Sequence, residues 1–233
     1  MIVAIIPARG GSKRIPRKNI RLFAGRPIIA YSITAARECG LFDRIIVSTD
    51  DGEIAAVARE CGAETPFVRP AELSGDHTGT DPVVAHALSW LAEHDTPVDV
   101  ACCIYATAPF LTPKDLRRGY ELLTPDKAFI FAVTSFAFPI QRAIRLLPGG
   151  GVTPFFPDDI DRRSQDLEPA YHDAGQFYWG WPRSFLDGLP EFAPHSAALV
   201  LPRWQAHDID TLEDWRHAEL IYEALHRDRT GQR

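Results

Sequence analysis

The chain has 233 residues, of which 45% are hydrophobic and 24% charged, so it holds enough apolar side chains for one globular domain with a sizeable core. This composition excludes a disordered chain, a collagen and a repeat array. Lys and Arg number 25 against 31 Asp and Glu, and the net charge of −6 argues against a nucleic acid or an anionic membrane as the partner. A binding site for a polyanion must therefore be a local basic pocket.

The N-terminal sequence and the cysteines indicate the compartment. The apolar run at residues 1–6 meets Pro7 and Arg9 at once, and it is too short for a signal peptide or a membrane span, as are all later runs. The chain has four cysteines without C-x-x-C spacing, Cys39, Cys61, Cys102 and Cys103. We expect a soluble cytoplasmic protein with reduced, buried thiols and neither a disulfide nor a zinc site.

Apolar runs of strand length alternate with segments of helical period along residues 1–134. The pattern predicts strands at about residues 2–6, 44–48, 98–104 and 128–134, and helices at about 27–39, 53–61, 83–94 and 113–123. Gly40 and Gly62 follow two of the helical segments, where helices commonly end. This alternation predicts an α/β fold with a mostly parallel central sheet flanked by helices.

The pattern changes after Thr134. Residues 136–170 carry Pro, Gly, Phe and charged side chains without a clear period, which is unusual inside a compact α/β domain. We expect an inserted arm here, within a single domain that spans residues 1–233. Strands are predicted again at 175–179 and 197–201, followed by a closing helix at about 211–225.

A dense basic loop directly follows the first predicted strand. Gly10 and Gly11 are surrounded by the cations Arg9, Lys13, Arg14, Arg17 and Lys18. Paired glycines let backbone N–H groups approach an anion, and Arg and Lys supply charge-assisted hydrogen bonds. Ligands of open α/β sheets bind at the carboxyl ends of strands. We therefore interpret the loop as a triphosphate site, with a solvated basic surface as the alternative.

The loop matches neither common phosphate motif, because the patterns G-x-x-x-x-G-K-[ST] and G-x-G-x-x-G are absent. It resembles the signature of the CMP-sugar-acid synthetases, the cytidylyltransferases of sialic-acid-like nonulosonates. The resemblance covers nearly the whole chain, through residues 48–51, 69–73, 106–109 and 208–210. It implies a nucleotide-diphospho-sugar transferase-like fold, CTP as a substrate, and a nucleotide site made of Ala8, Arg9, Gly10, Gly11, Ser12, Lys13, Lys18, Asn19, Arg69 and Ser74.

Departures from the sialate pattern bear on the second substrate. The sialate branch usually has Gly where this chain has Arg14, and Gln where it has Tyr105. Residues 138–142 and 163–179 resemble the branch that acts on pseudaminic acid. The resemblance therefore implies pseudaminic acid as the acceptor, with N-acetylneuraminate, legionaminate and Kdo as alternatives.

The sequence Asp208-Ile209-Asp210 alternates acidic and apolar side chains, so in extended geometry both carboxylates point to one face. Two carboxylates together with substrate phosphates suit Mg²⁺ or Mn²⁺. The alternative is helix capping, with Asp210 or Thr211 as the N-cap and Asp214 completing a capping box. The resemblance, which includes the family's D-x-D metal site, favours the metal.

A second acidic pair, Asp50 and Asp51, lies between a predicted strand and a predicted helix, which favours a helix cap or a structural role near the ribose. The eight histidines do not cluster at ligand spacing, and no Ser/His/Asp nucleophile motif is visible. A covalent nucleophile or a zinc centre is not expected.

A nonulosonic acid carries a carboxylate and two acylamino groups, so its pocket should pair a cation with amide and apolar contacts. The candidates are Tyr105, Arg163, Gln165, Gln176, Phe177 and Tyr178. Side chains alternate along a strand, so Phe177 and Trp179 face one side and Tyr178 the other, and not all three can line one cavity. Core packing is the alternative for each aromatic side chain, and spacing does not decide between Arg162 and Arg163.

These features predict an enzyme in which the anomeric hydroxyl of a 2-keto sugar acid attacks the α-phosphate of CTP and releases pyrophosphate. The expected catalytic groups, Arg9, Lys13, Lys18 and Asp210, act by positioning and charge stabilisation. A nucleotide-sensing protein without turnover and a sugar-1-phosphate nucleotidyltransferase are the alternatives. Related synthetases are dimers whose arm reaches across the neighbouring subunit, which implies a homodimer with residues 136–170 at the interface.

Overall fold

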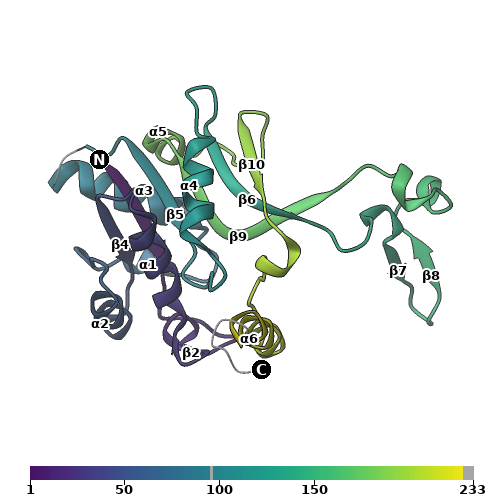
Figure 1. The fold of residues 1–233 in the computed structure, drawn as a ribbon, viewed down its shortest axis with the longest axis horizontal. Helices are drawn as coiled ribbons and strands as arrows, with labels where there is room; N and C mark the ends of the chain where they lie inside the picture. The colour runs from purple at the N-terminus through teal and green to yellow at the C-terminus, as the bar shows by residue number, and fades with distance from the viewer. Residues whose placement is uncertain (95–96, 228–233) are drawn as a thin grey trace.

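Within the part of the chain that the computed structural model describes, residues 1–94 and 97–227, six strands form the central sheet in the order β10-β6-β9-β5-β1-β4 (Figure 1). Their bounds are β1 Ile2–Pro7, β4 Arg44–Ser48, β5 Val100–Ile104, β6 Phe129–Ser135, β9 Tyr171–Gly180 and β10 Ser196–Val200. β1 pairs in parallel with β4 and β5, and β10 with β6. The predicted mostly parallel sheet is confirmed.

β9 is the exception, because it runs antiparallel to both β5 and β6. The chain leaves the sheet at the end of β6, passes through the arm, and comes back along β6 as β9 (Figure 1). A direct return of this kind gives antiparallel neighbours, whereas a parallel neighbour needs a crossover connection.

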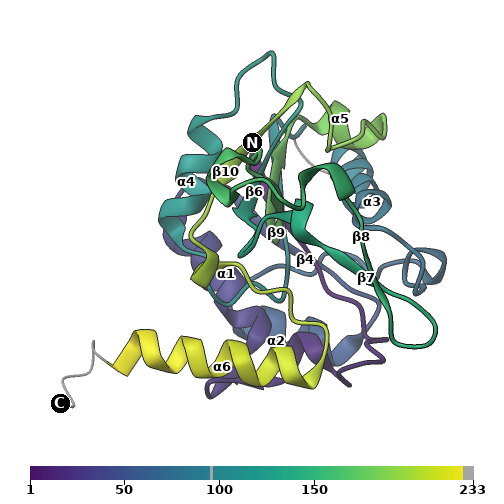
Figure 2. The ribbon, with the colours of Figure 1, turned by 90° about the vertical axis from the view of Figure 1, so that its right-hand side faces the viewer.

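Helices cover both faces of the sheet (Figure 2). Their bounds are α1 Ile28–Cys39, α2 Gly52–Glu60, α3 Thr80–His94, α4 Pro113–Glu121, α5 Pro182–Leu186 and α6 Leu212–Arg227. Successive side chains of β1 alternate between two cores: Ala4 and Ile6 pack under α1 and α4, whereas Val3 and Ile5 pack under α3 and α5. This explains why β1 is apolar throughout, as is typical of a strand buried on both faces.

The predicted helices are confirmed, with ends that shift by one to three residues. Gly40 ends α1 in the left-handed conformation, with φ of 72°, as a C-terminal glycine commonly does. The short elements were not predicted: the helix α5 and the hairpins β2–β3 (Leu22–Phe23, Arg26–Pro27) and β7–β8 (Ile144–Leu146, Val152–Pro154). Two- and three-residue strands and single-turn helices are too short to show a period.

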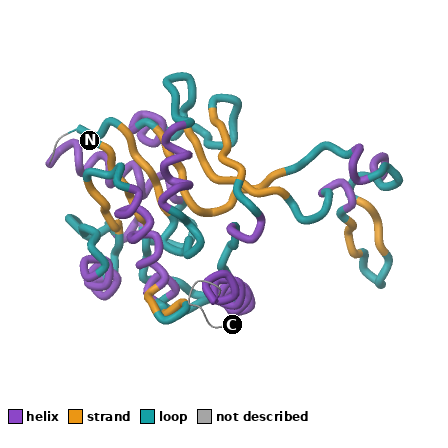
Figure 3. Tube along the Cα trace, in the orientation of Figure 1, coloured by secondary structure: helices purple, strands orange, loops and turns teal. Residues whose placement is uncertain are grey.

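Residues 136–170 form an arm that projects away from the sheet and its helices (Figures 1 and 3). The arm holds the β7–β8 hairpin and three short 3₁₀ helices, η3 (Ile140–Arg142), η4 (Pro157–Asp159) and η5 (Ser164–Asp166). It exposes large apolar side chains, including Phe138 at 82% and Leu146 at 77% of their surface.

Two further expectations concern membranes and thiols. Among the helices of residues 1–94 and 97–227, none is both long and apolar enough to span a bilayer. The four cysteines are free, and three of them are buried, Cys39, Cys102 and Cys103. Cys61 differs from the expectation and is half-buried, because it lies at the C-cap of α2.

Candidate functional site

The basic loop, residues 8–18, starts at the carboxyl end of β1 and ends at Lys18, the first residue of the 3₁₀ helix η1 (Lys18–Ile20). A cavity of about 260 Å³ opens beside it. The residues around this loop cavity include Arg9, Ser12, Lys13, Arg14, Lys18, Asn19, Arg69, Thr78, Gly79, Thr80, Tyr105, Thr107 and Asp210. Residues from four distant parts of the sequence thus meet at the edge of the sheet where ligands of α/β folds bind.

Ile15 anchors the middle of the loop. Its side chain is 1% exposed and packs in a cluster with Phe23, Trp215 and Ile209. Ile209 is the apolar residue between Asp208 and Asp210. This apolar contact therefore holds the basic loop and the acidic pair against each other.

Two cations of the loop share one carboxylate, that of Asp76. The Arg9 guanidinium lies 2.9 Å from it, and the Lys13 ammonium also pairs with it. These contacts, led by the hydrogen bond with Lys13, lower the pKa of Asp76. Because Arg9 and Lys13 both line the loop cavity, the Asp76 carboxylate occupies a position that suits an anionic ligand group.

The acidic residue Asp210 pairs with two further cations. Arg14 Nη2 lies 2.7 Å and Lys18 Nζ lies 3.3 Å from its carboxylate, and Lys18 also donates to the Ile209 carbonyl at 2.8 Å. The structure thus brings the expected catalytic residues Lys18 and Asp210 into direct contact, although 192 positions separate them in the sequence.

Capping does not use the carboxylate of Asp210. Thr211 Oγ1 accepts a hydrogen bond from the Asp214 N–H at 3.2 Å, and Asp214 accepts from the Thr211 N–H at 2.7 Å. This reciprocal pair is a capping box at the start of α6. Asp208 is exposed, and partial desolvation followed by the negative charge of Asp210 raises its pKa. The charge of Asp210 is thus the second cause of the raised pKa, after the desolvation of Asp208.

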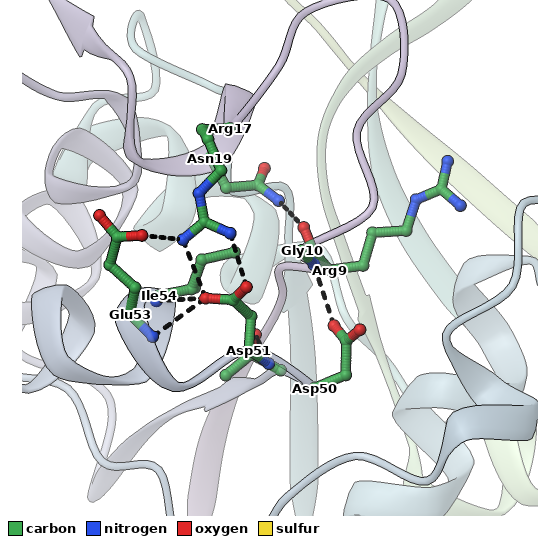
Figure 4. Close-up of polar contacts among 9 residues, drawn as sticks. Arg9, Gly10, Arg17, Asn19, Asp50, Asp51, Glu53 and Ile54 are labelled. Carbon is green, nitrogen blue, oxygen red and sulfur yellow. Dashed lines mark hydrogen bonds and ion pairs between the residues drawn. The ribbon is translucent and has the colours of Figure 1, made fainter.

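Two backbone N–H groups of the loop that were expected to bind an anion already donate hydrogen bonds within the chain. The Gly10 N–H donates to Asp50 Oδ1 at 2.9 Å (Figure 4), and the Ala8 N–H donates to the Ser48 carbonyl at 2.9 Å. Ala8 is buried. Both residues shape the loop, and neither offers a free N–H group to a phosphate. Asn19 is 7% exposed and donates to the Arg9 carbonyl at 2.9 Å.

Arg69 and Ser74 were the candidates for the nucleoside. Arg69 lines the loop cavity, is 4% exposed, and donates from Nε to Ser48 Oγ at 3.1 Å. Burial lowers the pKa of Arg69 to about 10, which leaves it charged at neutral pH. Ser74 does not line the cavity, and its hydroxyl donates to the Pro70 carbonyl at 3.0 Å.

The candidates for the sugar acid divide between the cavity and the core. Tyr105 lines the loop cavity, and its ring lies 6.0 Å from that of the buried Tyr178. Phe177 is fully buried on the opposite face of β9, beneath α4, so its expected contact with the substrate is corrected to a core role. Gln176 is 2% exposed and donates to the Gln205 carbonyl at 2.5 Å, whereas its Oε1 has no hydrogen-bond partner.

Arg163 and Gln165 lie on the arm. Arg163 Nε donates to Asp166 at 2.7 Å, and Arg162 pairs with Asp159 at 2.7 Å. Gln165 lines a second cavity, of about 270 Å³, between the arm and the end of β6. Neither residue belongs to the loop cavity of its own chain.

Sequence reasoning missed three consecutive residues of the cavity, Thr78, Gly79 and Thr80. They lead into α3, which begins at Thr80 and not, as predicted, near residue 83. The available signal was a Gly-Thr pair, Gly79-Thr80, shortly before a predicted helix, because helix N-termini are common anion positions. Among residues 1–94 and 97–227, no group of three or more His, Cys, Asp or Glu side chains is arranged to hold a metal ion.

The fold and the loop cavity define an α/β protein with a cation-lined cavity at the carboxyl edge of its sheet. A model of the cytidylyltransferase family matches residues 3–129. A pseudaminic acid cytidylyltransferase of Campylobacter jejuni is 46% identical over 225 residues, which cover 96% of this chain and 97% of that protein. The chain belongs to the cytidylyltransferase family.

Two further similarities are more distant. A CMP-N,N'-diacetyllegionaminic acid synthase of Legionella pneumophila is 30% identical over 95% of this chain and 96% of its own length. The solved structure of a CMP:2-keto-3-deoxy-manno-octonic acid synthetase complexed with CTP superimposes with a TM-score of 0.69 at 16% identity, and the match covers 96% of this chain and 99% of that chain. At this identity the structural likeness concerns the fold.

Proposed function

We propose that this protein transfers CMP from CTP to the anomeric hydroxyl of a 2-keto nonulosonic acid, namely pseudaminic acid, and releases pyrophosphate. The observation that carries this proposal is the loop cavity, which Arg9, Lys13, Arg14 and Lys18 line together with Asp210. Arg14 and Lys18 also pair with Asp210. The 46% identity to a protein named for this activity supports the choice of substrate. Because CTP is an intracellular nucleotide, we place the reaction in the cytoplasm.

In the proposed reaction, the triphosphate takes the place of the carboxylates that now pair with the loop cations. Arg9 and Lys13 would exchange Asp76 for phosphate oxygens, and Lys18 would do so beside Asp210. The anomeric oxygen forms a bond to the α-phosphorus while the bond from that phosphorus to the bridging oxygen breaks, and the proton of the anomeric hydroxyl passes to water. The negative charge that develops on pyrophosphate is then stabilised by cations that are already in position.

Asp208 and Asp210 would hold Mg²⁺ or Mn²⁺. The donor set fits, because the two carboxylates are two residues apart, Asp210 lines the loop cavity, and Thr211 and Asp214 form the capping box of α6. Mg²⁺ commonly binds one or two carboxylates together with substrate phosphates. When bound, the ion would neutralise phosphate oxygens and help to orient them for displacement. Arg14 and Lys18 would then turn from Asp210 toward the triphosphate.

The sugar acid would lie on the Tyr105 side of the cavity. The candidates Arg163 and Gln165 are on the arm, outside the cavity of their own chain. We propose a homodimer in which the arm of one chain reaches the cavity of the other and supplies a cation for the sugar carboxylate. The exposed Phe138 and Leu146 would be covered in that interface.

The experiment is an assay of pyrophosphate release with CTP, Mg²⁺ and one acceptor at a time. The acceptors are pseudaminate, N-acetylneuraminate, legionaminate, Kdo and a sugar 1-phosphate. We expect pseudaminate to exceed the others by at least about ten-fold in kcat/KM, because an unpaired polar group in a pocket costs roughly 1–3 kcal/mol. If another acid is used equally well, the assignment of pseudaminic acid as the acceptor is wrong. CTP binding without any turnover would favour a nucleotide-sensing protein.

A further inference from the structure

Arg17 differs from the other four cations of the basic loop, because it does not line the loop cavity. Figure 4 shows the Arg9 side chain pointing to one side of the loop and the Arg17 guanidinium turned to the other side, toward α2. Its backbone is left-handed, with φ of 58° and ψ of 30°, a conformation that residues other than glycine seldom adopt. The chain turns sharply here and directs the side chain of Arg17 away from the expected position of the nucleotide.

The Arg17 guanidinium forms a two-point ion pair with Asp51. Nη1 lies 2.5 Å from Oδ2, Nη2 lies 2.9 Å from Oδ1, and Nη2 also lies 2.5 Å from Glu53. Asp51 is at the same time the N-cap of α2, where Oδ1 accepts from the N–H groups of Glu53 and Ile54 at 3.0 Å each. Arg17 thereby holds the loop against a rigid helix terminus, and two-point pairs of this kind fix geometry as well as charge.

The other end of the loop rests on the same turn. The Gly10 N–H donates to Asp50, and a Cβ atom at Gly10 would lie 2.7 Å from Asp51 Oδ2. Glycine is therefore required at position 10 for close approach to the carboxylate that Arg17 grips. With Gly10 and Arg17 both on the Asp50–Asp51 turn, the loop between them is closed at its base and presents residues 12–15 to the cavity.

We propose that Arg17 is a positioning residue, whose clamp with Asp51 holds the basic loop in the shape that receives the triphosphate, without contacting phosphate itself. The proposal rests on the proposed function of the loop as the CTP site. It predicts that loss of the clamp weakens CTP binding more than it slows turnover at saturation, because bound triphosphate can itself restore the loop. The charged groups in contact with Arg17 are Asp51 and Glu53, both on the α2 side.

The sharpest test is Asp51→Asn. Asn caps a helix about as well as Asp, so α2 and the melting temperature should change little, but the charge that holds Arg17 is lost. If Arg17 positions the loop, the CTP dissociation constant measured by calorimetry and the KM for CTP should both rise about ten-fold, with kcat within about three-fold of the wild type. If Arg17 instead serves as a phosphate ligand, freeing it from Asp51 should leave the CTP affinity unchanged or improve it, and that result would overturn the proposal.

Arg17→Ala should give the same rise in the KM for CTP. The KM of the double variant should not exceed that of the more impaired single variant, because both substitutions remove the same contact. Effects that multiply in the double variant would also refute the clamp. The matched control is Arg44→Ala. Arg44, at the start of β4, forms a two-point ion pair with Glu64 away from the cavity, so its loss should leave the KM for CTP unchanged. If Arg17→Ala does not fold, Asp51→Asn alone decides.

The outcome separates this proposal from the proposed function. A wild-type chain that neither binds nor turns over CTP contradicts the proposed function. A wild-type chain that does both, with variants whose KM for CTP is unchanged, contradicts the clamp alone.

Discussion

The basic loop and the arm are both irregular segments, but they differ in whether their charged and apolar side chains find partners within the chain. Each cation of the loop has a carboxylate partner within the same chain, and Ile15 anchors its middle in a core cluster. The arm instead exposes Phe138, Leu146 and Val152, and its Arg163 pairs with Asp166 of the same short turn.

This difference predicts that the loop and the arm of one complete site come from different chains. If the loop binds CTP as proposed, it needs no partner to do so, because its contacts are complete within one chain. An arm with several exposed apolar side chains is incomplete in one chain, and such surfaces commonly meet another molecule. The nucleotide side of the site would then belong to one chain, and part of the sugar side to the other.

The largest effect is expected at Asp210. Asp210→Asn should reduce turnover roughly 100-fold or more, the size typical of losing one preorganised charge contact, and a chelator should abolish the activity of the wild type. The melting temperature should change little, because capping belongs to Thr211 and Asp214. Thr211→Ala is the reciprocal control, which should lose about 1 kcal/mol of stability and keep its turnover. The opposite pattern, in which Asp210→Asn melts early but turns over normally, would assign Asp210 to structure.

The second effect concerns the loop cations. Lys13→Ala and Lys18→Ala should each remove a charge-assisted phosphate contact worth roughly 1.5–3 kcal/mol, which is about ten- to a hundred-fold in CTP affinity or turnover. Calorimetry and the pyrophosphate assay measure the two quantities separately. Lys114→Ala, on the exposed side of α4, is the matched control. Normal affinity and turnover in both loop variants would mean that the loop is a solvated basic surface.

A substitution in the arm should weaken the dimer without destabilising the fold of the single chain. Leu146→Asp places a charge on a side chain that is 77% exposed in one chain, so the melting temperature of the monomer should hold, while light scattering should show a shift from dimer to monomer. The KM for the sugar acid should rise about ten-fold through the lost cation contact, with the CTP affinity unchanged. Leu220→Asp on α6, also exposed, is the control. A wild type that is monomeric and fully active at micromolar concentration would contradict the assembly.

The smallest effect is a dependence of stability on pH. Burial, followed by a hydrogen bond with Asp81, raises the pKa of Glu191 from 4.5 to about 7. Between these two values the folded chain binds more protons than the unfolded chain, so stability falls as pH rises through that window. Glu191→Gln should therefore flatten the decline in melting temperature between pH 5 and about 8 and raise it by a few degrees at the upper end. Asp187→Asn, an exposed carboxylate nearby, should keep the wild-type slope.

Local signals explain what the sequence predicted well. Strand length and helical period located β1, β4, β5 and β6 and the helices between them, and the loss of period located the arm. Alternation along β9 correctly separated Phe177 from Tyr178. Pairing over long distances was beyond these signals. Nothing local shows that Arg17 faces Asp51 or that Lys18 faces Asp210, because these pairs form only once the sheet brings strand ends together.

The residues that contact the sugar acid were hard to predict for a similar reason, because burial of a side chain depends on which helix covers its strand. The period of a strand tells which residues share a face, but not which face is covered by a helix, and α4 covers the face of Phe177. The sequence also did not show the role of Gly10. Its N–H group donates to Asp50, and a Cβ atom at this position would collide with the Asp51 carboxylate.

The assignment of loop and arm to different chains is tested most directly by mixing two impaired variants, Lys18→Ala in the loop and Arg163→Ala in the arm, at substrate concentrations below KM, where each alone keeps only a small part of wild-type activity. If each cavity combines the loop of one chain with the arm of the other, a mixed dimer contains one intact site, and random pairing should restore about a quarter of wild-type activity. The measurement is pyrophosphate release from CTP and pseudaminate after the two variants have exchanged subunits. No recovery, in a mixture shown to contain mixed dimers, would mean that loop and arm act within one chain and would contradict the account.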